Sequence, residues 1–212
     1  EKLEVDDVGY LMALLDTIEQ QFSVDTDSIH LIGWSNGGFM SYRMACEHSG
    51  RIASFMSLAG ANYKNEGVCA SASPVHVLQV HGTEDKIVEY GGGCWPDEIT
   101  EGKFNCYASA LESVTDWAKI NGCETLPRQL GPLDLDKSIP GPDTTVLLFE
   151  HKTGGAITEL WSVHGAGHGP RFNQRYTNMV INWILSHRRI GEKQRDVEPK
   201  RVMSPPSKET IE

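Results

Sequence analysis

The sequence predicts an α/β fold, in which helices cover both faces of a mostly parallel sheet. Apolar runs of strand length alternate with stretches whose apolar residues recur every three to four positions, and this alternation is typical of such folds. A glycine-rich turn at residues 33–38 stands directly between a strand pattern and a helix pattern. With 212 residues, 39% of them hydrophobic, the chain has the length of one domain and enough apolar side chains for a core.

The first half of the chain begins with an amphipathic helix. Its apolar residues follow helical spacing from Val8 to Phe22, and either Asp6 or Asp7 can serve as its N-cap. The elements expected next are a strand at 28–32, a helix from 36 to about 47, and strands at 55–59 and 75–80.

The second half opens with a loop rich in Gly, Pro and Cys over residues 91–105. The expected elements are then a helix marked by Leu111, Val114 and Ala118 and stopped by Asn121-Gly122, strands at 145–149 and 157–163 joined by a Gly-Gly turn, and a final helix with an apolar stripe from Phe172 to Ile184. Residues 188–212 are charged and contain Pro and Ser, so we expect a disordered tail after a folded part at 1–187.

Composition narrows the classes of function. The formal net charge is −10, which argues against a nucleic-acid-binding protein, because phosphate backbones require clustered Lys and Arg. No run of about twenty apolar residues is present, so no membrane span is expected. The five cysteines show no CxxC spacing, which disfavours a zinc or redox motif. Cys94 and Cys106 can form a disulfide that closes a loop, or the cysteines can be buried free thiols.

Ser35 is the predicted nucleophile. It lies in Gly33-Trp34-Ser35-Asn36-Gly37, a turn that exposes a serine between a strand and a helix and holds it in a strained backbone conformation. We expect side chains at the flanking glycines to collide with this turn. The N–H of Asn36, at the start of the helix, is a natural donor to an oxyanion.

An acid and a histidine should follow the nucleophile in that order. Asp85 comes just after the strand at 75–80, where α/β sheets collect functional residues; Glu84 and Asp97 are competing acids. His168 lies between glycines after the last strand, and we favour it as the base over His164.

Other candidate residues have alternative structural explanations. Trp34 and Trp95 are candidate substrate-binding walls, although ordinary packing explains them equally well. A zinc site formed by His164 and His168 is disfavoured, because their spacing needs a helix that Gly-Ala-Gly does not readily form. We therefore expect no metal. His76 and His81 are expected to be structural, with His81 hydrogen-bonded to the backbone of the acid loop.

The chain resembles the polyhydroxybutyrate depolymerase-like esterases, which are close kin of the feruloyl and acetylxylan esterases. The resemblance covers roughly residues 4–187 and lies in four segments: DDVGYLMALLDTIEQQFSVDTDSIHLIGWSNGGFMSYRMAC, PVHVLQVHGTEDKIVEYGGG, VTDWAKINGC and ELWSVHGAGHGPRF. It implies an α/β-hydrolase fold, with Asp85 at the family's acid position and His168 at its catalytic histidine. One departure is Gly169-Pro170-Arg171, where many relatives have Thr-Trp-Pro after the histidine.

The resemblance implies a serine carboxylic-ester hydrolase without a cofactor, acting on a polyester or on a feruloyl or acetyl ester such as a plant cell-wall ester. A prolyl-oligopeptidase-like peptidase and a non-catalytic hydrolase-like module are the alternatives. Family members carry strands upstream of the first helix and a loop that supplies a second oxyanion donor. We therefore expect residues 1–187 to be the C-terminal part of the catalytic domain, in a protein that is extracellular.

Overall fold

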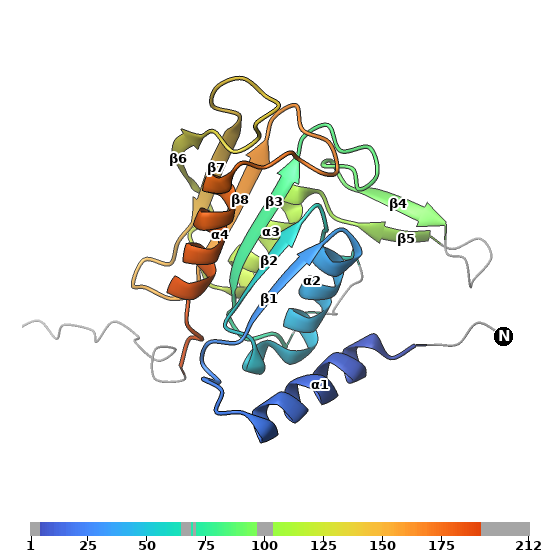
Figure 1. The fold of residues 1–212 in the computed structure, drawn as a ribbon, viewed down its shortest axis with the longest axis vertical. Coiled ribbons are helices and arrows are strands. Elements are labelled where there is room, and N and C mark those ends of the chain that lie inside the picture. Colours follow the sequence, from blue (N-terminus) through green and yellow to red (C-terminus); the bar gives the residue numbers. More distant parts are fainter. Residues whose placement is uncertain (1–4, 65–68, 70, 97–103, 192–212) are drawn as a thin grey trace, which may run out of the picture.

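A six-stranded sheet in the order β1-β2-β3-β8-β7-β6 forms the centre of the fold (Figure 1). The structure is a computed structural model that describes residues 5–64, 69, 71–96 and 104–191, and all structural statements concern these residues. The strands of this sheet are β1 (His30–Trp34), β2 (Ser54–Leu58), β3 (His76–Gly82), β6 (Arg128–Leu133), β7 (Thr144–Phe149) and β8 (Thr158–Val163).

The sheet is mostly parallel, as expected. Strands β1, β2, β3 and β8 run in the same direction, whereas β7 and β6 are antiparallel to their neighbours. Leu58 at the end of β2 pairs with both Trp34 and Val80, and Gly82 at the end of β3 pairs with Val163. The carboxyl ends of four neighbouring strands therefore meet at one edge of the sheet, which is where ligands bind in open α/β sheets.

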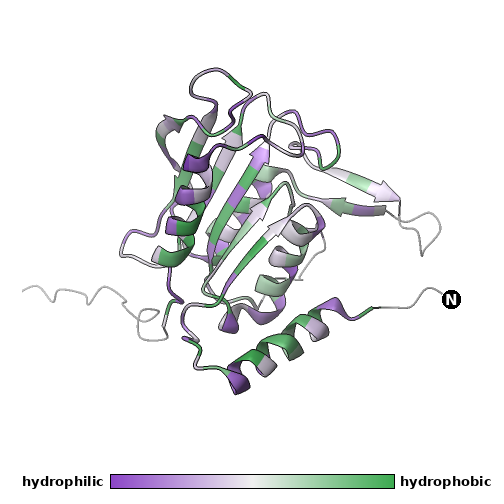
Figure 2. Cartoon of the chain, viewed as in Figure 1, coloured by the Kyte–Doolittle hydropathy of each residue, from purple (hydrophilic) through white to green (hydrophobic). Residues whose placement is uncertain are grey.

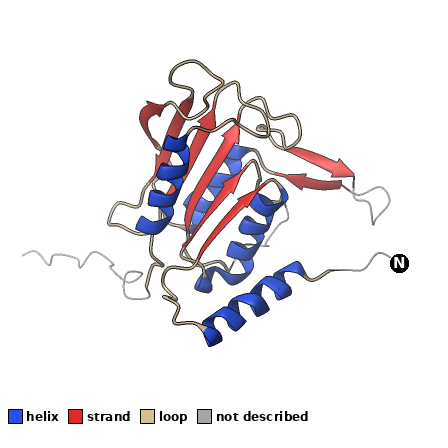
Figure 3. Ribbon diagram, in the orientation of Figure 1, coloured by secondary structure: helices blue, strands red, loops and turns tan. Residues whose placement is uncertain are grey.

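Helices cover both faces of the sheet (Figure 3). α2 (Asn36–His48) and α3 (Ala110–Ile120) pack on one face, where Tyr42, Phe55 and Trp117 belong to the same buried cluster. α4 (Gln174–Ser186) packs on the other face. Alternate residues of a strand point to opposite faces, so in β2 Phe55 faces α2 while Met56 faces α4. Figure 2 shows the resulting apolar centre.

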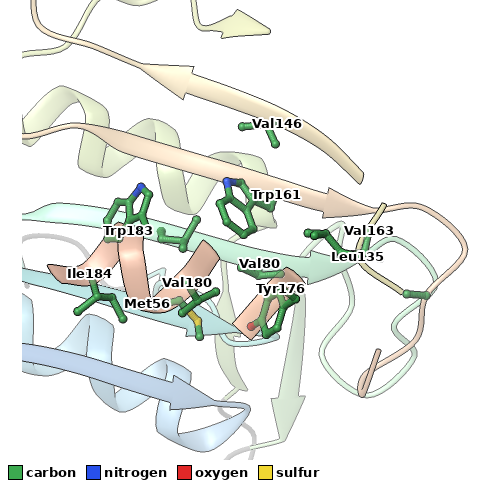
Figure 4. Close-up of a cluster of buried hydrophobic side chains, with 12 residues drawn as sticks. Met56, Val80, Leu135, Val146, Trp161, Val163, Tyr176, Val180, Trp183 and Ile184 are labelled. Carbon is green, nitrogen blue, oxygen red and sulfur yellow. The ribbon is translucent and has the colours of Figure 1, made fainter. Parts of the chain in front are cut away.

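The cluster beneath α4 is the largest part of the core (Figure 4). Val180 and Ile184 of α4 lie over Met56 and Val80 of the sheet. Beside them the buried carboxylate of Glu159 accepts hydrogen bonds from the indole N–H groups of Trp161 (2.7 Å) and Trp183 (2.9 Å). Two donors satisfy this carboxylate in an apolar setting, so it fixes how α4 lies on β8.

The first helix forms as predicted but does not contribute the apolar face that we expected. α1 (Asp7–Gln21) is capped by Asp6, whose Oδ1 accepts the N–H of Gly9 at 2.8 Å. Val8 is its single buried residue, while Ile18 and Phe22, expected in the core, are exposed. α1 lies below the sheet in Figure 1 and is tied to the 3-10 turn that follows α2, Ser49–Arg51, by ion pairs from Arg51 to Asp16 and Glu19.

Three sequence-based expectations are corrected. β1 begins at His30, two residues later than expected, and continues through Gly33 and Trp34 into the turn. The segment 91–105, expected to be a loop, contains the antiparallel strands β4 (Gly93–Pro96) and β5 (Phe104–Tyr107). Strand β6 was not expected, because its Gly131-Pro132 pair is atypical of strands; it is an edge strand, where proline is tolerated.

The start of the last helix and the start of the predicted tail also differ from expectation. Phe172 precedes α4 and stacks on Tyr176 with ring centroids 3.5 Å apart. Arg188 and Arg189, placed in the predicted tail, pair with Asp25 and Asp27. Residues 192–212, the rest of that predicted tail, lie outside the described residues.

Candidate active site

Ser35 occupies the turn between β1 and α2 in the conformation that the sequence predicts. Its backbone has φ 54° and ψ −118°, a region that non-glycine residues rarely adopt. Its N–H still donates to the carbonyl of Leu58 at 2.8 Å, so the turn stays attached to β2. Asn36 is the first residue of α2, and its N–H is among those that no carbonyl within the helix accepts.

The close packing at this turn depends on two glycines, one of which is not the expected one. A Cβ at Gly33 would overlap the carbonyl of Gly37, and a Cβ at Gly38 would lie 2.6 Å from Ser57 Oγ. A Cβ at Gly37 would meet nothing within 4 Å. The expectation of a collision is therefore right for Gly33 and wrong for Gly37, and Gly38 carries the second constraint because it packs against the end of β2.

Asp85 lies in the loop that follows β3, with its side chain fully buried. Oδ1 accepts the N–H groups of Ile87 (2.8 Å) and Val88 (3.1 Å), and Oδ2 lies 2.7 Å from Nδ1 of His168. Burial raises the pKa of Asp85, but hydrogen bonds from His81, His168 and the two backbone N–H groups outweigh it and lower the pKa to about 2. Asp85 is therefore a carboxylate at neutral pH.

Glu84, one of the two competing acids, is not in this position. Glu84 is exposed, and its N–H rather than its carboxylate contacts the histidine loop, donating to Ala166 O at 2.9 Å. Asp97 lies outside the described residues.

His168 approaches Asp85 because the acid loop and the histidine loop touch. A Cβ at Gly82 would overlap the carbonyls of Ala166 and Gly167, so only glycine permits this approach. The glycines beside His168 do not serve this purpose, because a Cβ would have open space at Gly167 and ordinary contact at Gly169. The rival His164 is exposed and bonded to Thr145 Oγ1 at 2.6 Å, at the end of β8.

Trp34 connects the turn that holds Ser35 to the loop that holds His168. The indole N–H of Trp34 donates to the main-chain carbonyl of His168 at 3.0 Å, and the indole and imidazole centroids lie 5.7 Å apart. Within the described part of the chain, no hydrogen bond joins Ser35 Oγ to His168. Catalytic hydrogen bonds often tighten only when substrate is bound, so this arrangement is compatible with proton transfer between the two side chains.

A cleft of about 420 Å³ opens beside the turn. Its lining residues are Asp7, Asn36, Gly37, Phe39, Met40, Arg43 and Tyr63. Trp95 does not line this cleft but packs edge-on against Phe39, with ring centroids 5.5 Å apart, and stacks on Tyr107. Trp34, the residue before Ser35, is 57% exposed and lies beside His168.

The cysteines of the chain have structural roles. Disulfides join Cys94 to Cys106 and Cys46 to Cys69, while Cys123 is a free thiol whose pKa burial raises to about 11. The described residues contain no group of three or more His, Cys, Asp or Glu side chains suited to a metal ion. They also contain no helix with the length and apolar character needed to cross a membrane.

His81 was expected to be structural, and its contact with Asp85 was not expected from the sequence. As expected, its Nε2 bonds to the backbone of the acid loop, at 2.8 Å from Val88 O. The same nitrogen also lies 3.3 Å from Asp85 Oδ2. The four-residue separation of the two residues was visible in the sequence, but the turn that folds one over the other was not.

Comparisons with known proteins agree with this architecture. The model of a phospholipase/carboxylesterase family matches residues 6–105. The acetyl xylan esterase of Aspergillus awamori superposes with a TM-score of 0.53 at 14% identity, over 84% of this chain and 66% of that one. Esterase PE8 superposes with a TM-score of 0.51 at 15% identity, over 88% of this chain and 67% of that one. The chain has the α/β-hydrolase fold.

In sequence the chain is similar to feruloyl esterases. It is 29% identical to feruloyl esterase B of Piromyces equi over 168 residues, which are 78% of this chain and 29% of that protein. It is 24% identical to feruloyl esterase D of Neurospora crassa over 166 residues, 78% of this chain and 48% of that protein. The chain thus spans about three-tenths to one half of the length of these curated relatives.

Proposed function

We propose that this protein is a serine carboxylic-ester hydrolase that works through an acyl-enzyme. The observation that carries the proposal is the 2.7 Å contact between Asp85 Oδ2 and His168 Nδ1, at the sheet edge where Ser35 sits in a strained turn. An ionised acid, an imidazole that it orients and a half-buried serine in a strained turn form an arrangement that can activate a serine hydroxyl. The esterase names of the sequence relatives support the same reaction.

Each side chain has a defined part in the proposed reaction. Ser35 Oγ attacks the ester carbonyl while His168 Nε2 takes its proton, and the N–H of Asn36 donates to the oxyanion that forms. His168 then gives the proton to the departing alcohol, which leaves Ser35 acylated. Water attacks the acyl-enzyme, again losing its proton to His168, and the acid and the free serine are released. Asp85 stabilises the imidazolium in both halves.

The proposed substrates are feruloyl or acetyl esters of plant cell walls, or a polyester of the polyhydroxybutyrate type. Feruloyl esterases among the relatives and the acetyl xylan esterase among the structures favour the first class. Trp34 and Trp95 are the proposed substrate-binding residues, because one flanks His168 and the other backs the cleft at Phe39. The two disulfides fit an extracellular protein, since disulfides persist in oxidising environments.

Labelling of the full-length protein with a fluorophosphonate tests the nucleophile. We expect labelling of the wild type, none of Ser35→Ala, and strongly reduced labelling of His168→Ala. His164→Ala is the matched control and should be labelled like the wild type. A labelled Ser35→Ala protein would show that another residue is the nucleophile.

A substrate panel then separates the classes of reaction. Methyl ferulate, acetylated xylan and a polyhydroxybutyrate film report on the proposed ester substrates, and a proline-containing peptide amide reports on the peptidase alternative. Hydrolysis of the amide in preference to every ester would replace the proposal by a peptidase. No labelling and no turnover by the wild type would favour a non-catalytic hydrolase-like module.

A further inference from the structure

A buried chain of polar side chains runs from α2 to the acid loop beneath the proposed catalytic residues. It consists of Tyr42 on α2, Gln79 and His81 on β3, and Asp85 after β3. Tyr42, Gln79 and His81 are each at most 1% exposed. Buried polar groups are costly unless they are hydrogen-bonded, so a fully connected set of this kind is a specified feature of the core.

The hydrogen bonds of Gln79 determine which ring nitrogen of His81 carries the proton. The Gln79 Nε2 group lies 2.7 Å from Gly60 O and 3.1 Å from His81 Nδ1, and Gln79 Oε1 lies 3.1 Å from the hydroxyl of Tyr42. Gly60 O can only accept, so the amide nitrogen must face it, and the second N–H of the amide then donates to His81 Nδ1. His81 is therefore a neutral ring with its proton on Nε2.

Tyr42 holds Gln79 in this orientation. Burial raises the pKa of the Tyr42 hydroxyl well above its ordinary range. The hydroxyl therefore stays protonated, and its O–H donates a hydrogen bond to Gln79 Oε1. Tyr42 lies on the helix that begins directly after Ser35. Gly60, the other partner of Gln79, packs so closely on Gly38 that a Cβ at Gly60 would lie 2.6 Å from the Gly38 carbonyl carbon. The network is therefore in contact with the turn and helix that follow Ser35.

The Nε2–H of His81 donates to the backbone of the acid loop, and the same nitrogen lies close to the Asp85 carboxylate. It lies 2.8 Å from Val88 O and 3.3 Å from Asp85 Oδ2. The N–H of Val88 in turn donates to Asp85 Oδ1 at 3.1 Å. His81 therefore contacts both ends of the turn from Asp85 to Val88, and the oxygen that it touches is the one that accepts His168 Nδ1.

We propose that His81 is a positioning residue, which orients the Asp85 carboxylate toward His168 and is itself oriented through Gln79 by Tyr42. The inference rests on the proposed function, in which Asp85 is the acid of the triad. Without the His81 N–H, the carbonyl of Val88 loses its partner and the carboxylate loses a polar group 3.3 Å from Oδ2. The carboxylate plane can then rotate away from His168, and small displacements of a catalytic group cost about a hundredfold in rate.

The test compares three variants of the full-length protein by their kinetics on an ester that the wild type hydrolyses. His81→Leu removes the donor; His81→Gln places an amide N–H close to the former Nε2; His76→Asn changes a second buried histidine of β3 at the far end of the strand. We expect His81→Leu to lower kcat by about tenfold to a hundredfold with KM nearly unchanged. His81→Gln should recover most of this loss, and His76→Asn should retain the wild-type kcat.

The pH profile distinguishes positioning from a merely structural role. In His81→Leu the carboxylate, turned away from His168, stabilises the protonated imidazole less, so the acid limb of kcat/KM should move to lower pH by about half a unit. His81→Gln and His76→Asn should keep the wild-type profile. An unchanged profile in His81→Leu, with a loss of activity that follows its melting temperature alone, would overturn the inference.

Tyr42→Phe keeps the inference testable if His81→Leu does not fold. It removes one hydroxyl at the far end of the network, and we expect kcat to fall about two- to tenfold, the range of one neutral hydrogen bond, with KM unchanged. A wild-type kcat in Tyr42→Phe would show that the network does not reach Asp85. An active wild type with unaffected His81 variants would overturn this inference alone, whereas an inactive wild type would overturn the proposed function as well.

Discussion

The indole N–H of Trp34 donates to the main-chain carbonyl of His168 at 3.0 Å, across 134 residues of sequence. Trp34 is the residue before the proposed nucleophile, and His168 is the proposed base. The bond joins the end of β1 to the loop after β8, two strands that are separated in the sheet by β2 and β3. It holds the histidine loop in place from the side of Ser35.

Trp34→Phe should therefore impair catalysis more than stability. The ring remains but the donor is lost, so His168 is less well held, and we expect kcat to fall about two- to tenfold. Trp34 is 57% exposed, so the free energy of unfolding should change little. Steady-state kinetics and urea denaturation check this. Tyr10→Phe, which alters an exposed aromatic side chain of α1, is the control, and an equal fall of kcat in both variants would contradict a specific role for the bond.

Gly82→Ala should separate the acid loop from the histidine loop. A Cβ at position 82 would overlap the carbonyls of Ala166 and Gly167, and overpacking of this kind typically costs about 1–3 kcal/mol. We expect a lower melting temperature and a large loss of fluorophosphonate labelling. Gly167→Ala has open space for its Cβ and should cost far less stability; an equal cost in both variants would argue against the close approach.

Alanine substitutions of Gly33 and Gly37 should have different effects on stability. Gly33→Ala forces a Cβ against the carbonyl of Gly37 and should destabilise the protein. Gly37→Ala lies in the first turn of α2 with open space around it, so it should leave stability unchanged or raise it by about 0.5–1 kcal/mol, the difference in helix propensity. Thermal denaturation of the pair measures this, and a destabilised Gly37→Ala would be inconsistent with the packing of the turn.

Stability should fall in mild acid because of His76. Burial, followed by the nearby charge of His187, lowers the pKa of His76 from its ordinary value near 6.5 to about 3. Between these values the unfolded chain binds a proton that the folded protein does not, so the His76 contribution is complete above pH 6.5 and is lost as the pH falls to about 3. Each unit of this pKa difference is worth about 1.4 kcal/mol.

Urea denaturation from pH 3.5 to 7.5 tests this dependence. His76→Asn keeps an acceptor for the N–H of Ile157, which Nδ1 of His76 accepts at 3.1 Å, but does not titrate. The slope of stability against pH should be shallower in His76→Asn than in the wild type. Identical slopes would place the titration elsewhere.

The Cys94–Cys106 disulfide should support both stability and substrate binding. It closes a short loop and ties β4 to β5, and removal of such a crosslink costs about 2–3 kcal/mol. β4 also carries Trp95, which packs on Phe39 in the cleft wall, so the double variant Cys94→Ser/Cys106→Ser should raise KM more than it lowers kcat. Cys123→Ser, which alters a free thiol, is the control and should change KM little.

Local patterns were sufficient for much of the fold. The strand and helix on either side of Ser35, the cap of α1 at Asp6 and the stop of α3 at Asn121-Gly122 are properties of adjacent residues, and all are present in the structure. The hairpin of β4 and β5 was missed because it is held by pairing across the chain and a disulfide rather than by an apolar alternation. The exposed stripe of α1 was misjudged because helical spacing indicates an apolar face but not what covers it.

For the candidate site, the order and the types of the chemical groups could be read from the chain: a serine in a strained turn, an acid after a strand and a histidine between glycines. How these groups are held could not be read from it. The contact of Asp85 with His81, the bond from Trp34 to His168 and the close approach at Gly82 depend on the sheet order β1-β2-β3-β8. Strand order is set by packing among residues far apart in the chain, and no local pattern encodes it.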